Sequence, residues 1–377
     1  MGFSDPSKVS VHGYGGWPLD EDFSKEYIDD VPSTPVWRGS DYLLFYGKGP
    51  VKWEYDSSSQ TFVHTNNPYS LYGYYFVTDA TPTNDMTSVA QASGATNRIT
   101  TYDDYLVHEQ ELVSLAKSGR ELYGEDFSGA TPRTLSTFSS IPGITNEDAK
   151  VTMSFVSKVT SGTGVASLSI NQSNVLDVSI RSNREEYVKA LEGVSTAVWK
   201  GEKSEKNSVV VSYNSASHNN VRLNYVRLHF KRTLQPYGAY TFFRSIASIG
   251  NVSRFVVQGA NANTLVFDVT DAQRVRLMET ELNGSELTFS IPAGTLREFV
   301  LVRTDQSFIS PEVVGEVENQ NLHALEQKDM IIIAAKAFQT QAERLAEEHR
   351  ATDGLTVEVV DPQSIYNEFS SGAPDAT

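Results

Sequence analysis

The sequence predicts a mainly β chain in which tandem antiparallel β-sandwich or jelly-roll modules precede the opening β-α-β of an α/β domain. Short alternating or aromatic-rich runs recur between residues 9 and 302, and turn residues separate them, as is typical of antiparallel strands. Near the C-terminus, two apolar runs flank a segment with helical spacing, which is typical of a β-α-β unit.

Residues 1–79 are the first expected unit, an N-terminal β domain rich in aromatic residues. Its hairpin signal is clearest where two strictly alternating runs flank the polar turn 56–60. A glycine-rich turn, residues 13–16, lacks the strand-to-helix context and the lysine of a phosphate loop. The expected strands are residues 9–16, 42–46, 51–55, 61–64 and 72–78.

Residues 80–222 are expected to form a β-sandwich domain of jelly-roll type, because several short alternating runs follow one another with turns between them. The stretch 79–99 is polar and reads as a long surface loop or domain junction. Residues 102–123 allow either a helix or a strand pair. The remaining strands are expected at residues 134–141, 150–159, 165–170, 174–180 and 209–213.

Residues 223–306 are expected to form a second β module, and residues 307–325 a polar linker that contains Pro311. The alternation in this module has the same period of two as in the preceding one. Its strands are expected at residues 224–231, 240–244, 254–257, 265–269, 286–290 and 298–302.

Residues 326–377 are expected to be the truncated start of an α/β domain. A strand at 328–335, a helix at 337–350 ended by Gly354, and a strand at 355–360 follow in order. Two strands and one helix cannot close a sheet covered on both faces, so we expect the natural protein to continue past residue 377. Half a sheet leaves an unpaired edge, so we expect this segment to be frayed or to dock poorly. The residues expected to share one helix face are Phe338, Ala342, Leu345 and Ala346.

Composition excludes several classes of protein. The 377 residues carry 31 Lys and Arg against 47 Asp and Glu, a net charge of −16, which argues against nucleic-acid binding. No run is long and apolar enough for a transmembrane segment, and the first residues lack the features of a signal peptide. Cysteine is absent, so these residues hold no disulfide, no thiolate metal site and no cysteine nucleophile.

We expect no catalytic, cofactor-binding or metal site within this chain. No two of the seven histidines have metal-ligand spacing on one helix. Acidic clusters read as solvated turns, with a structural calcium ion considered only around residues 20–30. The histidines are His12, His64, His108, His218, His229, His323 and His349, and the acidic clusters are Asp20-Glu21-Asp22, Asp29-Asp30, Asp103-Asp104 and Glu125-Asp126.

Residues 365–377, Ile-Tyr-Asn-Glu-Phe-Ser-Ser-Gly-Ala-Pro-Asp-Ala-Thr, follow the β-α-β pattern directly. In that position they resemble the start of the catalytic domain of gingipain-type cysteine peptidases, and within that group the type IX secretion system sortases. Residues 41–53, 67–76 and 266–270 are similar to earlier segments of those sortases. The C-terminal signature is the most specific of these matches.

The resemblance implies a caspase-like α/β peptidase domain whose catalytic histidine and cysteine lie beyond residue 377. It implies a parent enzyme, exported to the cell surface or outer membrane of Bacteroidota, that removes the C-terminal signal domain of type IX cargo. A thiolate would form an acyl-enzyme, and an amine on anionic lipopolysaccharide would take over the cargo. The implied partners are this cargo and an outer-membrane β-barrel protein. The chain itself would position and dock the catalytic domain and would be inactive alone.

Two other functions are compatible with parts of the sequence. A non-enzymatic β-sandwich adhesin or glycan-binding module would explain the β modules, and glycan binding by the chain would indicate it. A secreted gingipain-like protease would explain the C-terminal signature, although the N-terminal aromatic segments favour the sortase. The aromatic side chains of residues 17–75 could stack on sugars or line a partner surface, but packing within the core and the sheet explains them better.

Overall fold

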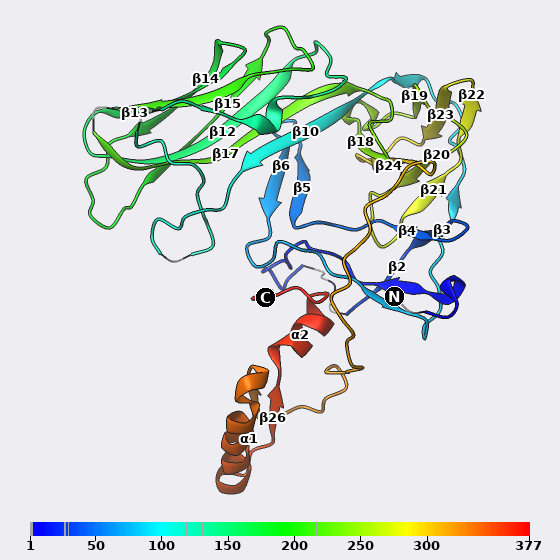
Figure 1. Cartoon of the computed structure of the whole chain (residues 1–377), viewed down its shortest axis with the longest axis vertical. Coiled ribbons are helices and arrows are strands. Elements are labelled where there is room, and N and C mark those ends of the chain that lie inside the picture. Colours follow the sequence, from blue (N-terminus) through cyan, green and yellow to red (C-terminus); the bar gives the residue numbers. More distant parts are fainter. Residues whose placement is uncertain (1–2, 26–27, 29, 118, 130, 216) are drawn as a thin grey trace.

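The computed structural model describes residues 3–377 except 26, 27, 29, 118, 130 and 216. The chain is mainly β, as expected, and two sandwiches share one nine-stranded sheet (Figure 1). In spatial order, the strands of this sheet are β15 (Leu191–Trp199), β12 (Ala149–Val159), β17 (His218–Thr233), β10 (Thr101–Glu109), β18 (Tyr240–Arg244), β24 (Glu298–Arg303), β20 (Thr264–Asp268), β21 (Arg276–Met278) and β8 (Ser88–Val89).

The first sandwich packs strands β15, β12, β17 and β10 against a four-stranded sheet. Alternating side chains of both sheets fill its core, where Phe155 stacks on Tyr213 at 5.3 Å between ring centroids. The strands of the facing sheet are β11 (Arg133–Thr134), β16 (Val209–Asn214), β13 (Thr163–Ile170) and β14 (Ser173–Arg181).

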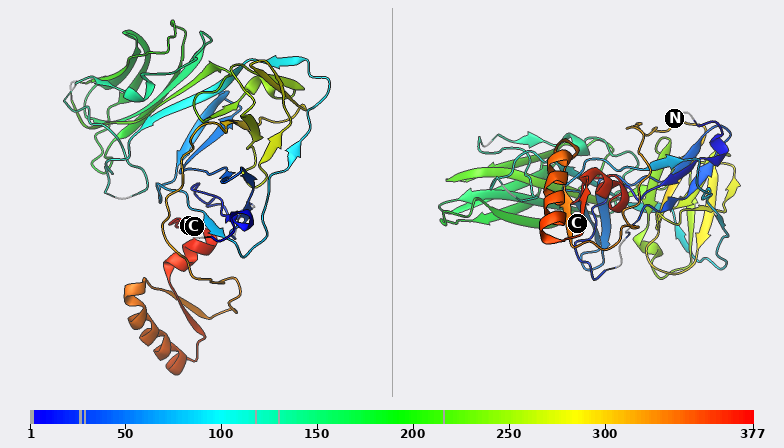
Figure 2. Two further views of the ribbon diagram at one scale, coloured as in Figure 1. Left: turned by 45° about the vertical axis from the view of Figure 1, so that its right-hand side comes forward. Right: turned by 90° about the horizontal axis from the view of Figure 1, so that it is seen from below.

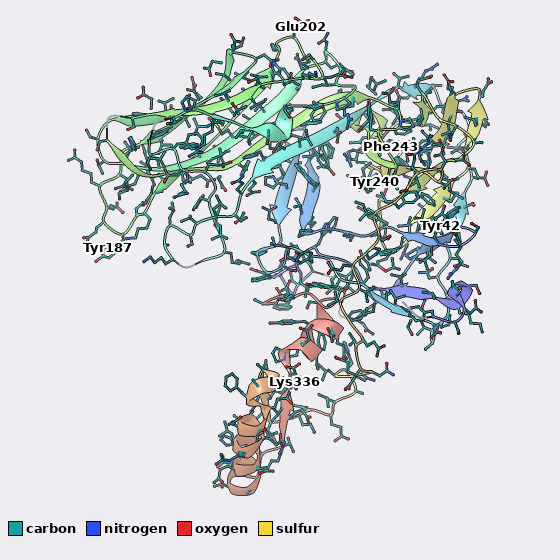
Figure 3. The ribbon with its side chains drawn as sticks, in the orientation of Figure 1. Tyr42, Tyr187, Glu202, Tyr240, Phe243 and Lys336 are labelled. Carbon is teal, nitrogen blue, oxygen red and sulfur yellow. The ribbon has the colours of Figure 1, made fainter. Side chains whose placement is uncertain are left out.

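The second sandwich packs the other half of the long sheet against a second four-stranded sheet. Its core is aromatic: Phe243 stacks on Phe299 at 5.4 Å, and Phe255 stacks on Phe289 at 5.0 Å. Figure 3 shows Phe243 between the strands of this sandwich. The facing strands are β22 (Glu281–Asn283), β23 (Glu286–Ile291), β19 (Ser253–Val257) and β9 (Asn97–Ile99).

The N-terminal segment, residues 3–79, covers the outer face of the long sheet. Trp37 of one hairpin packs beside Phe267 of the second sandwich. Trp53 of another hairpin stacks on Tyr105 of β10 at 3.9 Å. The strands of this segment are β1 (Ser10–His12), β2 (Ser33–Thr34), β3 (Val36–Arg38), β4 (Leu43–Phe45), β5 (Val51–Asp56), β6 (Thr61–Asn66) and β7 (Phe76–Thr78).

The C-terminal α/β segment projects from the β modules, and the left view in Figure 2 shows it apart from the sandwiches. Strand β25 (Met330–Ile333) pairs in parallel with β26 (Val357–Val360), and helix α1 (Gln339–Glu348) connects them through a π-helical turn at His349–Asp353. Gly354 ends this turn with φ of +69°, as expected for a left-handed C-terminal cap. Helix α2 (Pro362–Phe369) follows and leads back to the N-terminal segment.

Two expectations about the C-terminal segment are corrected. Ala342 and Ala346 are buried as expected, but Phe338 and Leu345, expected on the same face, are 65% and 49% exposed. Phe338 lies in the 3-10 turn Lys336–Phe338 before α1, and the helix packs on β26. Residues 369–377 also hydrogen-bond to the N-terminal segment, so the expectation of poor docking is wrong for this part. The expected fraying of the strands stays a prediction.

Three expectations about the β modules are also corrected. Residues 134–141 were expected to be a strand, but Leu135, Phe138 and Ile141 are all buried, and this spacing of three fits the short 3-10 helix Ser136–Phe138. The expected surface loop 79–99 contributes β8 and β9, which pair in parallel with distant strands. The boundary expected between residues 222 and 223 falls inside β17, which pairs with both β10 and β12.

Strand β15 was not expected at all. Its exposed positions carry Val194 and Val198, which are 53% and 42% exposed, whereas the three central inward positions carry the small residues Gly193, Ser195 and Ala197. A Cβ at Gly193 would lie 2.6 Å from a methyl carbon of Val178, so only a glycine fits beside β14. The ambiguous stretch 102–123 begins with a strand, β10.

Candidate functional site

Five of the seven histidines are paired with carboxylates, and His12 and His218 instead contact the Thr81 hydroxyl and backbone carbonyls. Among the residues that the structure describes, no group of three or more His, Cys, Asp or Glu side chains could hold a metal ion. Asp22 caps its own turn through Ser24, and Asp29 of the neighbouring acidic cluster lies outside the described residues. The pairs are His64–Glu109, His108–Glu125, His229–Asp103, His323–Glu368 and His349–Asp353.

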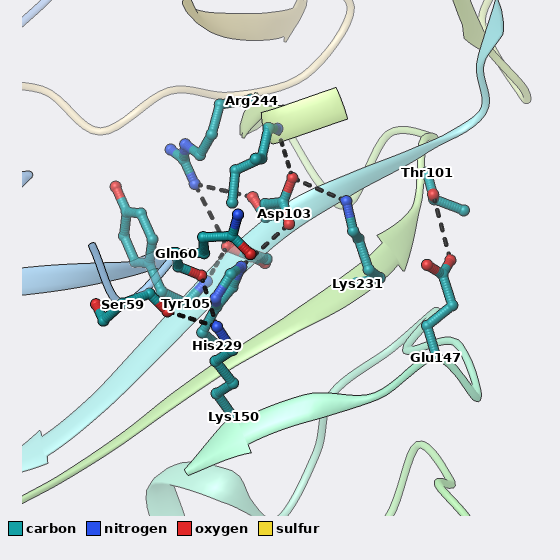
Figure 4. Close-up of polar contacts among 12 residues, drawn as sticks. Ser59, Gln60, Thr101, Asp103, Tyr105, Glu147, Lys150, His229, Lys231 and Arg244 are labelled. Carbon is teal, nitrogen blue, oxygen red and sulfur yellow. Dashed lines mark hydrogen bonds and ion pairs between the residues drawn. The ribbon is translucent and has the colours of Figure 1, made fainter. Parts of the chain in front are cut away.

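A buried charge network lies where the two sandwiches meet, and Asp103 on β10 is its centre (Figure 4). The Asp103 carboxylate is 2% exposed and accepts hydrogen bonds from His229 Nε2 at 3.0 Å, Lys231 Nζ at 2.9 Å and the Ile246 N–H at 2.7 Å. Burial raises the pKa of Asp103, but these hydrogen bonds and the Lys231 charge outweigh it and hold the pKa below its ordinary value.

Arg244 on β18 is the second centre of this network. Its guanidinium is buried, donates to Glu298 at 3.1 Å and lies 4.3 Å from the centre of the Tyr105 ring. Strands β10 and β18 pair only at Asp103 and Arg244. The charges balance, since Asp103, Asp104 and Glu298 oppose Lys231, Arg232 and Arg244. We therefore assign this network a structural role. It joins the two sandwiches where the strands β10 and β18 share a single residue pair.

A docking site for the C-terminal turn, residues 370–373, is built from the N-terminal segment. Ser371 is fully buried, accepts a hydrogen bond from the Tyr14 N–H at 3.2 Å and donates to the Tyr74 carbonyl at 3.0 Å. The Tyr14 hydroxyl donates to the Phe369 carbonyl at 2.7 Å, and burial raises its pKa, so it remains a donor. The Leu19 N–H donates to Asp375 at 3.1 Å.

Backbone geometry makes this docking site possible. Gly13 has φ of +126°, and a Cβ there would lie 2.5 Å from Ser371 Oγ. Ser371 itself is left-handed, with φ of +53°. The sequence did not predict this role for the glycine-rich turn 13–16. The two partners are more than 350 residues apart, and the only local signal was the cluster of glycines itself.

A second anchor fixes the linker to α2. The Glu368 carboxylate is 7% exposed and accepts hydrogen bonds from Gln320 Nε2 at 3.0 Å, from the Leu322 and His323 N–H groups at 2.8 Å and from His323 Nδ1 at 2.5 Å. Burial raises the pKa of Glu368, but these donors lower it to about 2. The linker therefore ends on the same helix that leads to the docking turn.

Comparison with known proteins gives two matches that bear on this architecture. Residues 323–377 match the model of peptidase family C25. The whole chain is similar to the crystal structure of dimeric latent PorU from Porphyromonas gingivalis, with 32% identity and a TM-score of 0.91, and covers 36% of that chain. This chain belongs to the gingipain-type family. The resemblance seen in the sequence is thereby confirmed, and the chain spans about a third of the length of its relative.

Other comparisons add no argument. A cycloisomaltooligosaccharide glucanotransferase of Paenibacillus sp., complexed with cycloisomaltoheptaose, has 8% identity and a TM-score of 0.17, and the match covers 57% of this chain and 48% of that chain. No curated protein matches the chain. Within the described residues, no helix is long and apolar enough to cross a membrane.

Proposed function

We propose that this chain is the positioning part of a cell-surface cysteine peptidase and sortase. The enzyme removes the C-terminal signal domain of type IX secreted cargo and attaches the cargo to anionic lipopolysaccharide. The observation that carries this proposal is the likeness to PorU over the whole chain, from the first β domain to the docking turn. A general gingipain-type protease would require only the C-terminal segment to match.

The chemistry belongs to residues outside this chain, because a thiolate nucleophile is required and the chain has no cysteine. The proposed contribution of this chain is to position the catalytic domain. The N-terminal segment of the chain grips the turn at residues 370–373, and that turn directly follows the helix of the C25 segment. The partners under this proposal are the cargo, the glycolipid amine and an outer-membrane β-barrel protein, and the location is the cell surface.

The test is inactivation of the gene in the bacterium that encodes this chain. We expect cargo proteins to keep their C-terminal signal domain, as seen by mass spectrometry, and to lose their glycolipid-linked forms on gels. Complementation with the wild-type gene should restore both. Normal cargo processing in the mutant would contradict the proposal, and a loss of general proteolysis alone would favour a secreted gingipain-like protease.

The positioning role is tested separately by complementation with Tyr14→Phe, which removes the hydroxyl that donates to the Phe369 carbonyl. We expect slower cargo processing at unchanged protein level. Tyr42→Phe is the matched control, because the Tyr42 ring packs on Trp37 and Phe308, away from the docking turn. Equal rates of cargo processing by the two variants would contradict the proposal that this chain positions the catalytic domain.

A further inference from the structure

The β5–β6 hairpin stands between the long sheet and the docking site (Figures 1 and 3). At its foot, the Lys48 carbonyl accepts a hydrogen bond from the Gly16 N–H at 3.1 Å, and Asn67 Nδ2 donates to the Gly16 carbonyl at 2.8 Å. Gly16 belongs to the glycine-rich turn whose Tyr14 holds Ser371. The foot of the hairpin is therefore bonded to the segment that grips the C-terminal turn.

The hairpin also contacts the long sheet directly: Trp53 and Phe62 pack on Tyr105, and Lys150 of β12 donates to the Ser59 and Gln60 carbonyls of the hairpin turn. A further contact with the sheet centres on His64 of β6. Its side chain is 4% exposed, its Nε2 lies 2.7 Å from Glu109 of β10, and its Nδ1 lies 3.2 Å from a terminal nitrogen of Arg227 on β17. A guanidinium can only donate hydrogen bonds, so His64 Nδ1 must accept and carries no proton. The imidazole is therefore the neutral Nε2–H tautomer, which donates to Glu109.

The buried Arg227 guanidinium needs this tautomer of His64 as its hydrogen-bond acceptor. Arg227 is 7% exposed, and within the described part of the chain no other hydrogen bond or ion pair reaches its guanidinium, whose Nε has no partner. The Tyr225 ring, 5.3 Å away, gives it a cation–π contact. A proton on His64 Nδ1 would remove the acceptor and bring a second positive charge against a buried cation.

No other group described around His64 replaces its Nδ1 as an acceptor for the Arg227 guanidinium. Asn66 Nδ2 donates to Glu109 at 2.8 Å and, at 3.4 Å, to Glu111, so both carboxylates face the amide. The rings of Trp53 and Tyr225 pack on the imidazole at 5.3 Å and 4.9 Å between centroids. Glu109 would attract a protonated imidazole, but it faces the nitrogen that already bears a proton.

We propose that His64 is a positioning residue that, only in its neutral form, completes the polar contact of the β5–β6 hairpin with the sheet, beside the apolar contacts of Trp53 and Phe62, and so helps to hold the docking turn in place. This inference rests on the proposed positioning role of the chain for its functional meaning. Its structural content, a proton-dependent contact between the hairpin and the sheet, concerns the chain itself.

His108 on β10, the strand that also carries Glu109, provides a matched control. Its Nε2 faces Glu125 at 2.7 Å, as in the His64 pair, but its Nδ1 faces the Thr137 hydroxyl at 2.9 Å. A hydroxyl can accept as well as donate, so His108 can take a second proton without losing a partner. Both histidines thus have a carboxylate at Nε2, and they differ in the partner of Nδ1.

The experiment measures hydrogen-exchange protection factors in the whole chain at about pH 8 and about pH 5, the range in which an ordinary imidazole gains its second proton. The reporters are the Tyr14 and Asn67 amides, which donate to Ser371 and to Pro50. In the wild type we expect acidification to lower both protection factors about tenfold, the equivalent of one broken buried hydrogen bond. His64→Gln keeps a donor and an acceptor without titrating, and should hold its protection at both pH values.

Two results would overturn the proposal. One is an NMR assignment of the proton to His64 Nδ1 at neutral pH. The other is an equal acid response in the wild type and in His64→Gln, with His108→Gln as the reference for general acid effects. The hydrogen-exchange measurement does not require peptidase activity. A negative result in the cargo-processing test would therefore not affect the proposal about His64, and a negative result in the exchange experiment would not affect the sortase proposal.

Discussion

At the residue scale, Asp103 shows how a single buried charge holds two sandwiches together. Its pKa is lowered, so its contribution to stability is present above the ordinary aspartate pKa of about 3.9 and is lost as pH falls through the folded-state value. Asp103→Asn leaves Lys231 without its carboxylate partner, and we expect a loss of about 3 kcal/mol in the free energy of unfolding by denaturant titration. Exposed Asp41→Asn is the control, and an equal effect of both would refute the assigned role.

The docking site makes a second prediction at this scale. Gly13→Ala forces a side chain into a left-handed backbone and against Ser371, so we expect the C-terminal turn to loosen by about 1–3 kcal/mol. Hydrogen exchange of the Tyr14 amide measures this. Gly49→Ala is the control, because a Cβ there meets no atom within 4 Å. Unchanged protection in Gly13→Ala would show that the turn is held by other contacts.

At the element scale, Glu368 decides where the linker joins α2. Its pKa of about 2 means that its stabilisation is present above the ordinary glutamate pKa and disappears as pH falls toward about 2. Glu368→Gln turns an acceptor of four hydrogen bonds into a group that also donates, and we expect a cost of about 2 kcal/mol for this anchor. Exchange of the Leu322 and His323 amides should accelerate, whereas exposed Glu316→Gln should leave it unchanged.

At the scale of the whole molecule, the nine-stranded sheet makes residues 80–306 one structural unit rather than two. Strand β17 pairs with β10 along nine residues and with β12 on its other side, so a break at 222/223 would expose both ladders. We expect neither piece of such a split to show a cooperative thermal transition by circular dichroism. Residues 3–306, cut in the linker, should keep the transition of the β modules. A cooperative transition in residues 3–222 alone would instead support the domain boundary between residues 222 and 223 that the sequence analysis predicted.

Strand positions could be predicted where their signals are local. The alternation at 51–55 and 61–64 locates the β5–β6 hairpin, and the apolar runs at 328–335 and 355–360 locate β25 and β26. The prediction failed where a distant partner defines the element. Strands β8 and β9 form because they pair with the edges of β21 and β19, and position 193 on the inward side of β15 is a glycine because Val178 of β14 lies against it. The docking site could not be predicted for the same reason, since Tyr14 and Ser371 meet only in the folded chain.

The sequence by itself determined the mainly β class, the β-α-β at the end, the family through residues 365–377, and the absence of a cysteine nucleophile, because composition and local periodicity carry these properties. Only the tertiary structure decided how the parts are joined. The shared sheet, the charge network at Asp103, the grip on Ser371 and the tautomer of His64 all depend on groups that are distant in the chain. Their stability comes from burial and from hydrogen-bond geometry, and both exist only once the strands have packed.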